Sequence, residues 1–411
     1  MAKAPSKTDS LDFLAFSPFA FFTGSGFNWM QTAIDTQEFI ELSTIAKREK
    51  PQWTTPNEVV GELDTFKLRK FSVNLSDTAI PTLVLPPYAG HYSTIADYAE
   101  GQSLVQTLMD AGVENVYSLD YNSATPLMKD YSIDNYLAAL NVYIDDIANS
   151  QGDKVNLVGL CQGGWFAALY AARFPQNVQS LVIAGSPIDT HAGEGHLEIT
   201  VRENEASFFE RLVSMGNGLM NGEFMVMGFK NMNPDKHYVE KYQDLWSHVK
   251  GQENNEEAIE RFKRFEIWYE NTLMLPGRWY LQVIEQLFRD NKFVKGEFSA
   301  LGRTISPKAI TVPTYLLAGE KDDITLPEQV FDAEKYFGTP KSKLVKGMSD
   351  GGHIGLFMGR STLKEHWTKI GAWIRANQPE SAVATAKPKA KAEPKTAPKA
   401  PKAAAKPKPK K

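Results

Sequence analysis

Cysteine is almost absent from the sequence, because the 411 residues include only Cys161. A single cysteine cannot form a disulfide within the chain, and nothing argues for an oxidising compartment. The sequence also lacks metal-ligand spacings, a Rossmann glycine run and a phosphate-binding loop, so we expect neither a metal nor another cofactor. A charge, a proline and glycines interrupt the apolar stretch 11–34, which leaves no span long enough to cross a bilayer. We therefore expect a cytoplasmic protein.

Outside the last 30 residues, acidic side chains outnumber basic ones. The formal net charge is −4, but the last 30 residues contain ten lysines and one glutamate, so the remainder carries about −13. Residues 379–411 are mostly alanine, lysine and proline without periodicity, which predicts a disordered tail. Lysine-rich tails bind polyanions by counterion release, so nucleic acid or an acidic granule surface are candidate partners. A tail that only increases solubility is the alternative.

Aromatic residues are concentrated in the N-terminal segment 1–50. These side chains either pack on the main domain or form an apolar surface that meets a polymer granule, a partner subunit or a second copy of the chain. Residues 34–48 within the segment have the pattern of an amphipathic helix. The aromatic residues are Phe13, Phe16, Phe19, Phe21, Phe22, Phe27 and Trp29.

The stretch 155–173 has the pattern of a nucleophile elbow. Residues 155–158 have strand character, and residues 165–173 have helix character. Between them lies Gly-x-Cys-x-Gly-Gly, with Cys161 at the apex and Gly159, Gly163 and Gly164 beside it. A strained turn of this kind brings neighbouring residues so close together that only small side chains fit. Strand, tight turn and helix around a nucleophile are typical of α/β-hydrolases.

The wider pattern predicts an α/β-hydrolase fold, in which a mainly parallel sheet is joined by crossover helices. The core would comprise residues 51–190 and 304–378. Residues 191–303 are helical in pattern and rich in methionine and aromatic residues, which predicts an inserted helical cap. Most of its apolar side chains are expected to form a core, and a few to line a channel to Cys161. The expected elements are strands in 56–85, 113–119, 155–158, 180–184 and 310–317, and helices at 101–110, 133–149 and 361–376.

Two later positions complete a candidate catalytic triad with Cys161. Asp322 follows the strand predicted at 310–317, and His353 lies in a glycine-rich loop before the last helix. Nucleophile, acid and histidine is the chain order of α/β-hydrolases. Asp323 is the alternative acid if the strand end is offset by one residue. The acidic pair could also be a solvated turn.

The oxyanion hole is expected from two backbone amides. One belongs to Gln162, directly after the nucleophile, and the other to Tyr88 or Ala89 in the loop after the strand that ends near Leu85. The same loop contains His91. Its position suits the oxyanion loop, but it is equally consistent with a loop histidine that stacks on a neighbouring tyrosine.

The chain resembles the intracellular polyhydroxyalkanoate depolymerases and the polyhydroxyalkanoate synthases, two related branches of cysteine α/β-hydrolases. The paired glycines after Cys161 resemble the synthase box, whereas Asp322-Asp323 resembles the depolymerases, since synthases usually carry Asp-His there. The resemblance covers roughly residues 80–375. Further segments that resemble the depolymerases are 186–190, 228–237, 279–282, 319–324 and 352–357.

The resemblance implies polyester metabolism more firmly than a direction of reaction. We expect hydrolysis of polyhydroxybutyrate through a cysteine acyl-enzyme, with Cys161, Asp322 and His353 as the triad. The first alternative is a synthase that polymerises 3-hydroxyacyl-CoA with the same triad. The second is a granule-associated protein without activity, which tethers granules through its basic tail.

Overall fold

The computed structural model describes residues 29–71, 79–149, 154–251 and 255–378. The predictions for the aromatic residues before Trp29 and for the basic tail lie outside these ranges. Within them, no helix combines the length and the apolar character that crossing a membrane requires.

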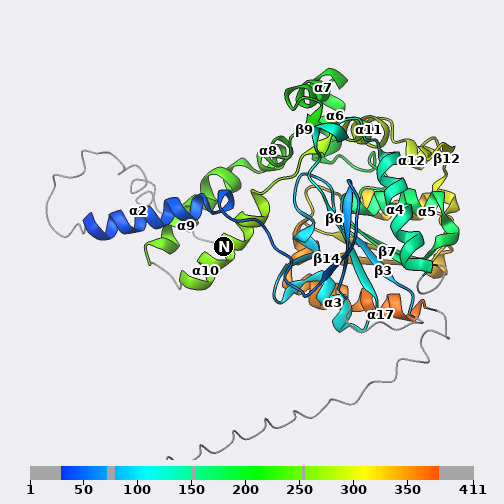
Figure 1. Cartoon of the computed structure of the whole chain (residues 1–411), viewed down its shortest axis with the longest axis horizontal. Coiled ribbons are helices and arrows are strands. Elements are labelled where there is room, and N and C mark those ends of the chain that lie inside the picture. Colours follow the sequence, from blue (N-terminus) through cyan, green and yellow to red (C-terminus); the bar gives the residue numbers. More distant parts are fainter. Residues whose placement is uncertain (1–28, 72–78, 150–153, 252–254, 379–411) are drawn as a thin grey trace, which may run out of the picture.

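The predicted fold class is confirmed by an eight-stranded, mainly parallel sheet (Figure 1). Its first two strands, β1 and β2, pair antiparallel with each other, and β2 pairs antiparallel with β6. All later neighbours are parallel and are reached through crossover connections. Across the sheet, the strands are β1 (Glu58–Glu62), β2 (Phe66–Lys70), β6 (Val116–Tyr121), β3 (Thr82–Leu85), β7 (Val155–Leu160), β8 (Val178–Ala184), β13 (Thr314–Gly319) and β14 (Leu344–Ser349).

Helices cover both faces of the sheet, and each face has its own apolar core. On β3, Leu83 and Leu85 point into one core while Val84 points into the other, as the twofold period of a strand requires. The first core contains α4 (Ile133–Asn149), α5 (Gln162–Arg173), α13 (Pro327–Phe331) and α14 (Ala333–Tyr336). The second contains α3 (Leu104–Asp110), α15 (Gly355–Met358) and α17 (Thr368–Ala376), with α16 (Arg360–Thr362) and the short strands β4 (Asp97–Ala99) and β5 (Gln102–Ser103) nearby.

Several observed boundaries differ from the predicted ones. The strand predicted at 113–119 is β6, which begins later because a turn follows α3 and precedes it. The single helix predicted at 361–376 is divided into α16, a π-helical segment Leu363–Trp367 and α17. The prediction for β6 identified the element and placed its start too early, since element ends are defined least sharply. The last helix has nearly the predicted ends and differs only in its π-helical interior.

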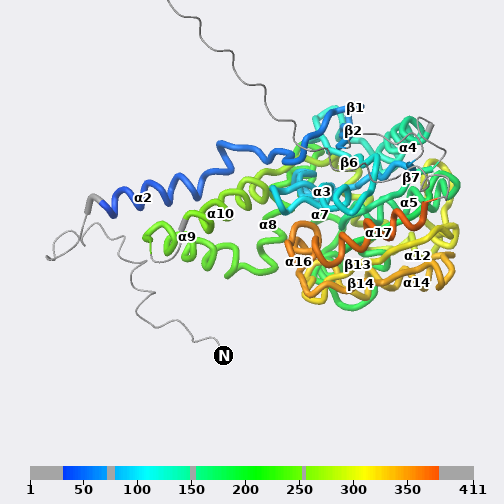
Figure 2. The backbone as a smooth tube through the Cα atoms, turned by 90° about the horizontal axis from the view of Figure 1, so that it is seen from below, coloured from blue at the N-terminus to red at the C-terminus, as the bar shows by residue number. Residues whose placement is uncertain are grey.

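The segment between β8 and β13 is mainly helical. Part of it extends away from the sheet, where α9 and α10 lie beside the N-terminal helix α2 (Trp29–Ser43) (Figures 1 and 2). Phe39 of α2 contacts Trp246 of α9 with ring centroids 5.5 Å apart. The helices of this segment are α6 (His196–Glu203), α7 (Ala206–Met215), α8 (Gly222–Met232), α9 (Lys241–Val249), α10 (Asn255–Tyr269), α11 (Gly277–Gln282) and α12 (Lys292–Lys295), with π-helical turns at Lys236–Glu240 and Val283–Arg289 and the strand pairs β9 (Leu219–Met220) with β10 (Leu275–Pro276) and β11 (Ser299–Ala300) with β12 (Arg303–Thr304).

Candidate active site

Cys161 occupies a sharp turn between β7 and α5. Its backbone angles are φ 51° and ψ −122°, a region that non-glycine residues rarely adopt. Close packing explains the flanking glycines. A Cβ on Gly159 would lie 2.4 Å from the Gly164 Cα, and one on Gly163 would lie 1.9 Å from the Leu85 carbonyl oxygen. The turn therefore holds the thiol at the end of the sheet at the cost of local strain.

His353 and Asp322 are held together beside this turn. The Nδ1 atom of His353 lies 2.8 Å from Oδ2 of Asp322 and 3.0 Å from Oδ1, and both side chains are buried. Asp322 follows β13, and His353 lies in the loop after β14. The backbone amides of Ile324 and Thr325 donate to Oδ1 of Asp322 over 3.0 and 2.8 Å. These bonds fix the carboxylate that orients the imidazole.

The electrostatic surroundings of His353 favour its protonated form. Burial is the largest influence and opposes a charge, but the Asp322 carboxylate and the Cys161 side chain together raise the pKa of His353 well above its ordinary value. His353 and Cys161 line the same cavity. His353 thus combines a carboxylate partner at Nδ1 with a thiol close enough to influence the charge of the ring, as a general base between acid and nucleophile requires.

Asp323, the alternative acid, points elsewhere. Its Oδ2 accepts a hydrogen bond of 2.7 Å from the Asn233 side chain, and the carboxylate is exposed. Only Asp322 of the two is bonded to His353 in the described part of the chain. The sequence could not choose between adjacent aspartates, because one residue of offset at a strand end reverses the direction of the side chain.

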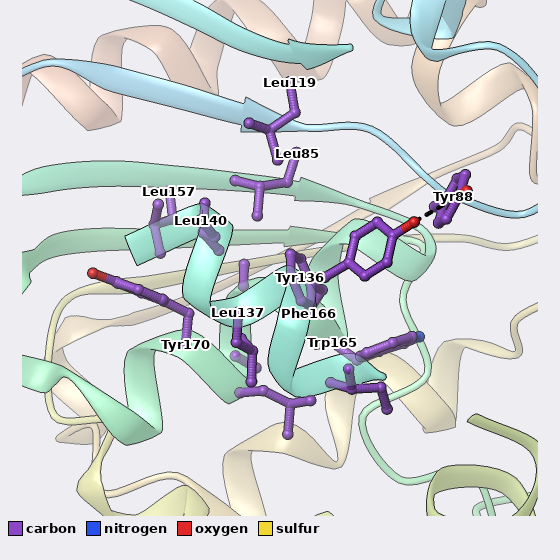
Figure 3. Close-up of a cluster of buried hydrophobic side chains, with 14 of the residues drawn as sticks. Leu85, Tyr88, Leu119, Tyr136, Leu137, Leu140, Leu157, Trp165, Phe166 and Tyr170 are labelled. Carbon is purple, nitrogen blue, oxygen red and sulfur yellow. Dashed lines mark hydrogen bonds between the residues drawn. The ribbon is translucent and has the colours of Figure 1, made fainter. Parts of the chain in front are cut away.

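Tyr88 anchors the loop that was predicted to supply an oxyanion-hole amide. Its ring stacks on Tyr121 with centroids 4.6 Å apart, and its hydroxyl accepts a hydrogen bond of 3.2 Å from Tyr136, the dashed line in Figure 3. Its backbone amide, however, donates to the side-chain oxygen of Gln162. To accept a hydrogen bond from the Tyr88 amide, an oxyanion has to displace the side-chain oxygen of Gln162. The backbone amides of Ala89 and Gln162 remain predicted donors.

A cavity of about 380 Å³ lies over the nucleophile. Side chains from the sheet domain and from the segment between β8 and β13 line it together. Its apolar walls suit an acyl chain, and the thiol and imidazole provide reactive polar atoms. The residues that line it include Cys161, His353, His91, Phe229, Trp268 and Tyr269.

His91 lies in this cavity wall, with partners that the sequence did not indicate. Its ring stacks on Trp268 at 4.8 Å and is tilted against Tyr269 at 4.9 Å, instead of stacking on the neighbouring tyrosines. Burial, opposed by Glu270, lowers the pKa of His91 to about 4. No local signal could have identified these partners, because Trp268 and Tyr269 belong to α10, far along the chain.

The low pKa of His91 predicts a measurable loss of stability in acid. The folded-state pKa lies below the ordinary value of 6.5, so the unfolded chain takes up the proton first and stability falls as pH drops from 6.5 towards 4. The decrease in the free energy of unfolding between pH 7 and pH 5 should be about 2 kcal/mol smaller in His91→Phe than in the unaltered chain. Urea unfolding at both pH values measures this difference. Identical pH dependence in the two proteins would contradict it.

Comparison with known proteins places most of the chain in one family. The family model described as "Protein of unknown function (DUF3141)" matches residues 69–372. The chain belongs to the DUF3141 family. Among solved structures, the DUF3141 protein is similar to Paleococcus ferrophilus monoacylglycerol lipase, with a TM-score of 0.47 and 16% identity over 76% of this chain and 99% of that one.

Curated relatives of this DUF3141 protein are named poly(3-hydroxyalkanoate) polymerase subunit PhaC. The Haloferax mediterranei protein is 27% identical over 326 residues, which are 78% of this chain and 64% of that protein. The Haloarcula marismortui protein is 28% identical over 341 residues, 78% of this chain and 67% of that protein. The Synechocystis protein is 27% identical over 331 residues, which are 79% of this chain and 85% of that protein. The DUF3141 chain thus spans about two thirds of the length of the first two relatives.

These names correct the expected direction of reaction. The prediction that the DUF3141 protein hydrolyses polyester is wrong, since its relatives are named as polymerase subunits. The likeness to polyhydroxyalkanoate enzymes itself is supported. The residues that suggested hydrolysis could not decide the direction, because one triad serves both reactions and only the group that attacks the acyl-enzyme differs.

Proposed function

We propose that this chain is a cysteine-dependent acyltransferase that polymerises 3-hydroxyacyl-CoA into a polyester. The observation that carries the proposal is the hydrogen-bonded pair of His353 and Asp322 beside Cys161, at an apolar cavity that Cys161 and His353 both line. The names of the curated relatives support polymerisation as the direction. No cofactor takes part in the proposed reaction.

In the first step, the acyl group would pass from CoA to Cys161. His353 takes the thiol proton, and the sulfur attacks the thioester carbonyl carbon to form a tetrahedral oxyanion. The amides of Gln162 and Ala89 are the proposed donors to this oxygen. The carbon–sulfur bond to CoA then breaks, and the CoA thiolate takes the proton from His353. Asp322 holds the imidazole in the tautomer that both transfers need.

In the second step, the 3-hydroxyl of another acyl unit would attack the acyl-enzyme. His353 accepts the hydroxyl proton, the new ester bond forms, and the Cys161 sulfur leaves and is protonated again. Water in the same position would hydrolyse the acyl-enzyme instead. The apolar walls of the cavity support polymerisation, because they disfavour water next to the thioester.

Release of CoA tests the proposal directly. The purified chain is incubated with 3-hydroxybutyryl-CoA, free CoA thiol is followed with a thiol reagent, and the products are separated into polymer and free acid. We expect CoA release together with polymer, and neither with Cys161→Ala. Free 3-hydroxybutyrate without polymer would assign hydrolysis, and absence of CoA release would contradict an acyltransferase. A third outcome would favour tethering. In that case the chain releases no CoA, and deletion of the tail changes the position of granules within the cell.

A further inference from the structure

The loop after β3 is held in place at both of its ends. At its start, α5 packs directly against it, because a Cβ on Gly163 would lie 1.9 Å from the Leu85 carbonyl oxygen. At its other end, the Leu273 amide donates to the Gly90 carbonyl over 2.7 Å. The backbone of this loop therefore has a fixed position relative to the turn at Cys161.

The Tyr88 amide in this loop has a cavity-lining side chain as its acceptor. The Tyr88 ring points into the core, where it stacks on Tyr121 and is 1% exposed. On either side of it in the chain, Pro87 and Ala89 line the cavity, as does Gln162. The amide donates to the side-chain oxygen of Gln162, and no backbone carbonyl among the described residues accepts from it.

The Gln162 side chain can leave this position without a movement of the backbone. Gln162 is the first residue of α5, directly after Cys161, so its backbone is held by the helix. Its side chain is long and rotatable, and the cavity of about 380 Å³ that it lines provides room for another rotamer. Its oxygen lies between a fixed backbone amide and the residue that carries the nucleophile. That is the kind of position in which an oxyanion is stabilised.

We propose that the Gln162 side chain occupies the oxyanion hole of the resting enzyme and that the developing oxyanion displaces it. The Tyr88 amide then joins the amides of Gln162 and Ala89 as a donor. The oxyanion displaces the side chain because a hydrogen bond to an ionised acceptor is about twice as strong as one to a neutral carbonyl. A bound, unreacted acyl group has only a neutral carbonyl and gains nothing from the exchange.

Gln162 therefore acts through the Tyr88 amide, by reserving it for the transition state. The inference deepens the proposed function. It rests on the part of that function in which Cys161 accepts an acyl group, and it does not depend on whether the acyl-enzyme is then polymerised or hydrolysed.

Two replacements of Gln162 should change the acylation rate in opposite directions. Gln162→Met keeps the length of the side chain but removes its oxygen, which frees the Tyr88 amide. Its kcat/KM for p-nitrophenyl butyrate should rise about fivefold, the factor that one neutral hydrogen bond provides. Gln162→Glu holds the amide more tightly and places a negative charge beside the oxyanion, so kcat/KM should fall about 100-fold. Release of p-nitrophenol in the first turnover measures both.

Binding of propyl trifluoromethyl ketone gives a second readout that needs no turnover. The Cys161 sulfur adds to the ketone carbonyl carbon, the thiol proton passes to His353, and the former carbonyl oxygen becomes an anion in the oxyanion hole. Fluorine NMR gives the dissociation constant of this adduct. Gln162→Met should bind the ketone about fivefold more tightly than the unaltered chain, and Gln162→Glu more weakly. A purely structural role of Gln162 would weaken binding in both variants.

A loss of kcat/KM in both folded variants, or no change in either, would overturn the inference. Gln162→Leu also lacks the oxygen and replaces Gln162→Met if that variant does not fold. The two proposals fail separately. Opposite changes in the variants, without CoA release from 3-hydroxybutyryl-CoA, would retain this inference and reject the polymerising acyltransferase. CoA release with an unchanged rate in Gln162→Met would do the reverse. An unaltered chain that forms neither a p-nitrophenol burst nor a ketone adduct would overturn both.

Discussion

Replacement of Cys161 by alanine is expected to lower acyl transfer by about 10⁶-fold, as removal of a triad nucleophile does in other enzymes. Without the sulfur, no acyl-enzyme forms, and only binding in the cavity and the oxyanion donors remain. The measurement is CoA release from 3-hydroxybutyryl-CoA together with intact mass, which should show the acyl adduct on the unaltered chain and none on Cys161→Ala.

The fold of the Cys161→Ala protein should be unchanged, which makes the loss interpretable. The replaced side chain is small and partly exposed, and alanine occupies the same backbone conformation with the same strain. We expect the free energy of unfolding to change by less than about 1 kcal/mol. Residual turnover above a tenth of the original rate in a folded variant would show that Cys161 is not the nucleophile.

Replacement of Asp322 by asparagine should lower kcat by about 10⁴-fold, and Asp323→Asn provides the matched control. The side-chain nitrogen of an asparagine at position 322 cannot accept a hydrogen bond from the Nδ1–H group of His353. His353 therefore loses the tautomer that it needs towards Cys161. The amide oxygen can still accept from the backbone amides of Ile324 and Thr325, so the turn should persist. Asp323 bonds only to the Asn233 side chain among its described contacts, and its replacement should change kcat by less than about threefold.

The pH dependence of the two variants adds a second readout. Asp322 raises the pKa of His353, so Asp322→Asn should also shift the histidine-dependent limb of the rate profile to lower pH. Asp323→Asn should leave that limb in place. A larger loss in Asp323→Asn than in Asp322→Asn would reverse the assignment of the acid.

The local part of the site could be predicted from the sequence, because local residues determine it. Strand, glycines and helix around Cys161 are consecutive, and the close packing of Gly159 against Gly164 involves only that short segment. The close approach of Gly163 to Leu85 of β3 depends on a distant strand. The parallel sheet was also predictable from the alternation of apolar strands and helices. The start of β6 and the π-helical interior of the last helix were less predictable.

Features that depend on distant contacts could not be predicted. The partners of His91 on α10 and the bond from the Tyr88 amide to the Gln162 side chain arise only when remote segments fold together. The direction of reaction is different in kind. It depends on which nucleophile reaches the acyl-enzyme, and the identity of the triad residues contains no information about that.

The distribution of the triad over three strands has a consequence for how the protein becomes active during synthesis. Cys161 follows β7, whereas Asp322 and His353 follow β13 and β14, and the whole helical insertion separates them in the chain. Cys161 therefore leaves the ribosome long before Asp322 and His353. Contacts so distant in sequence are slow to form. Under the proposed function, a nascent or truncated chain would take no acyl group from CoA until the last parallel strand has joined the sheet.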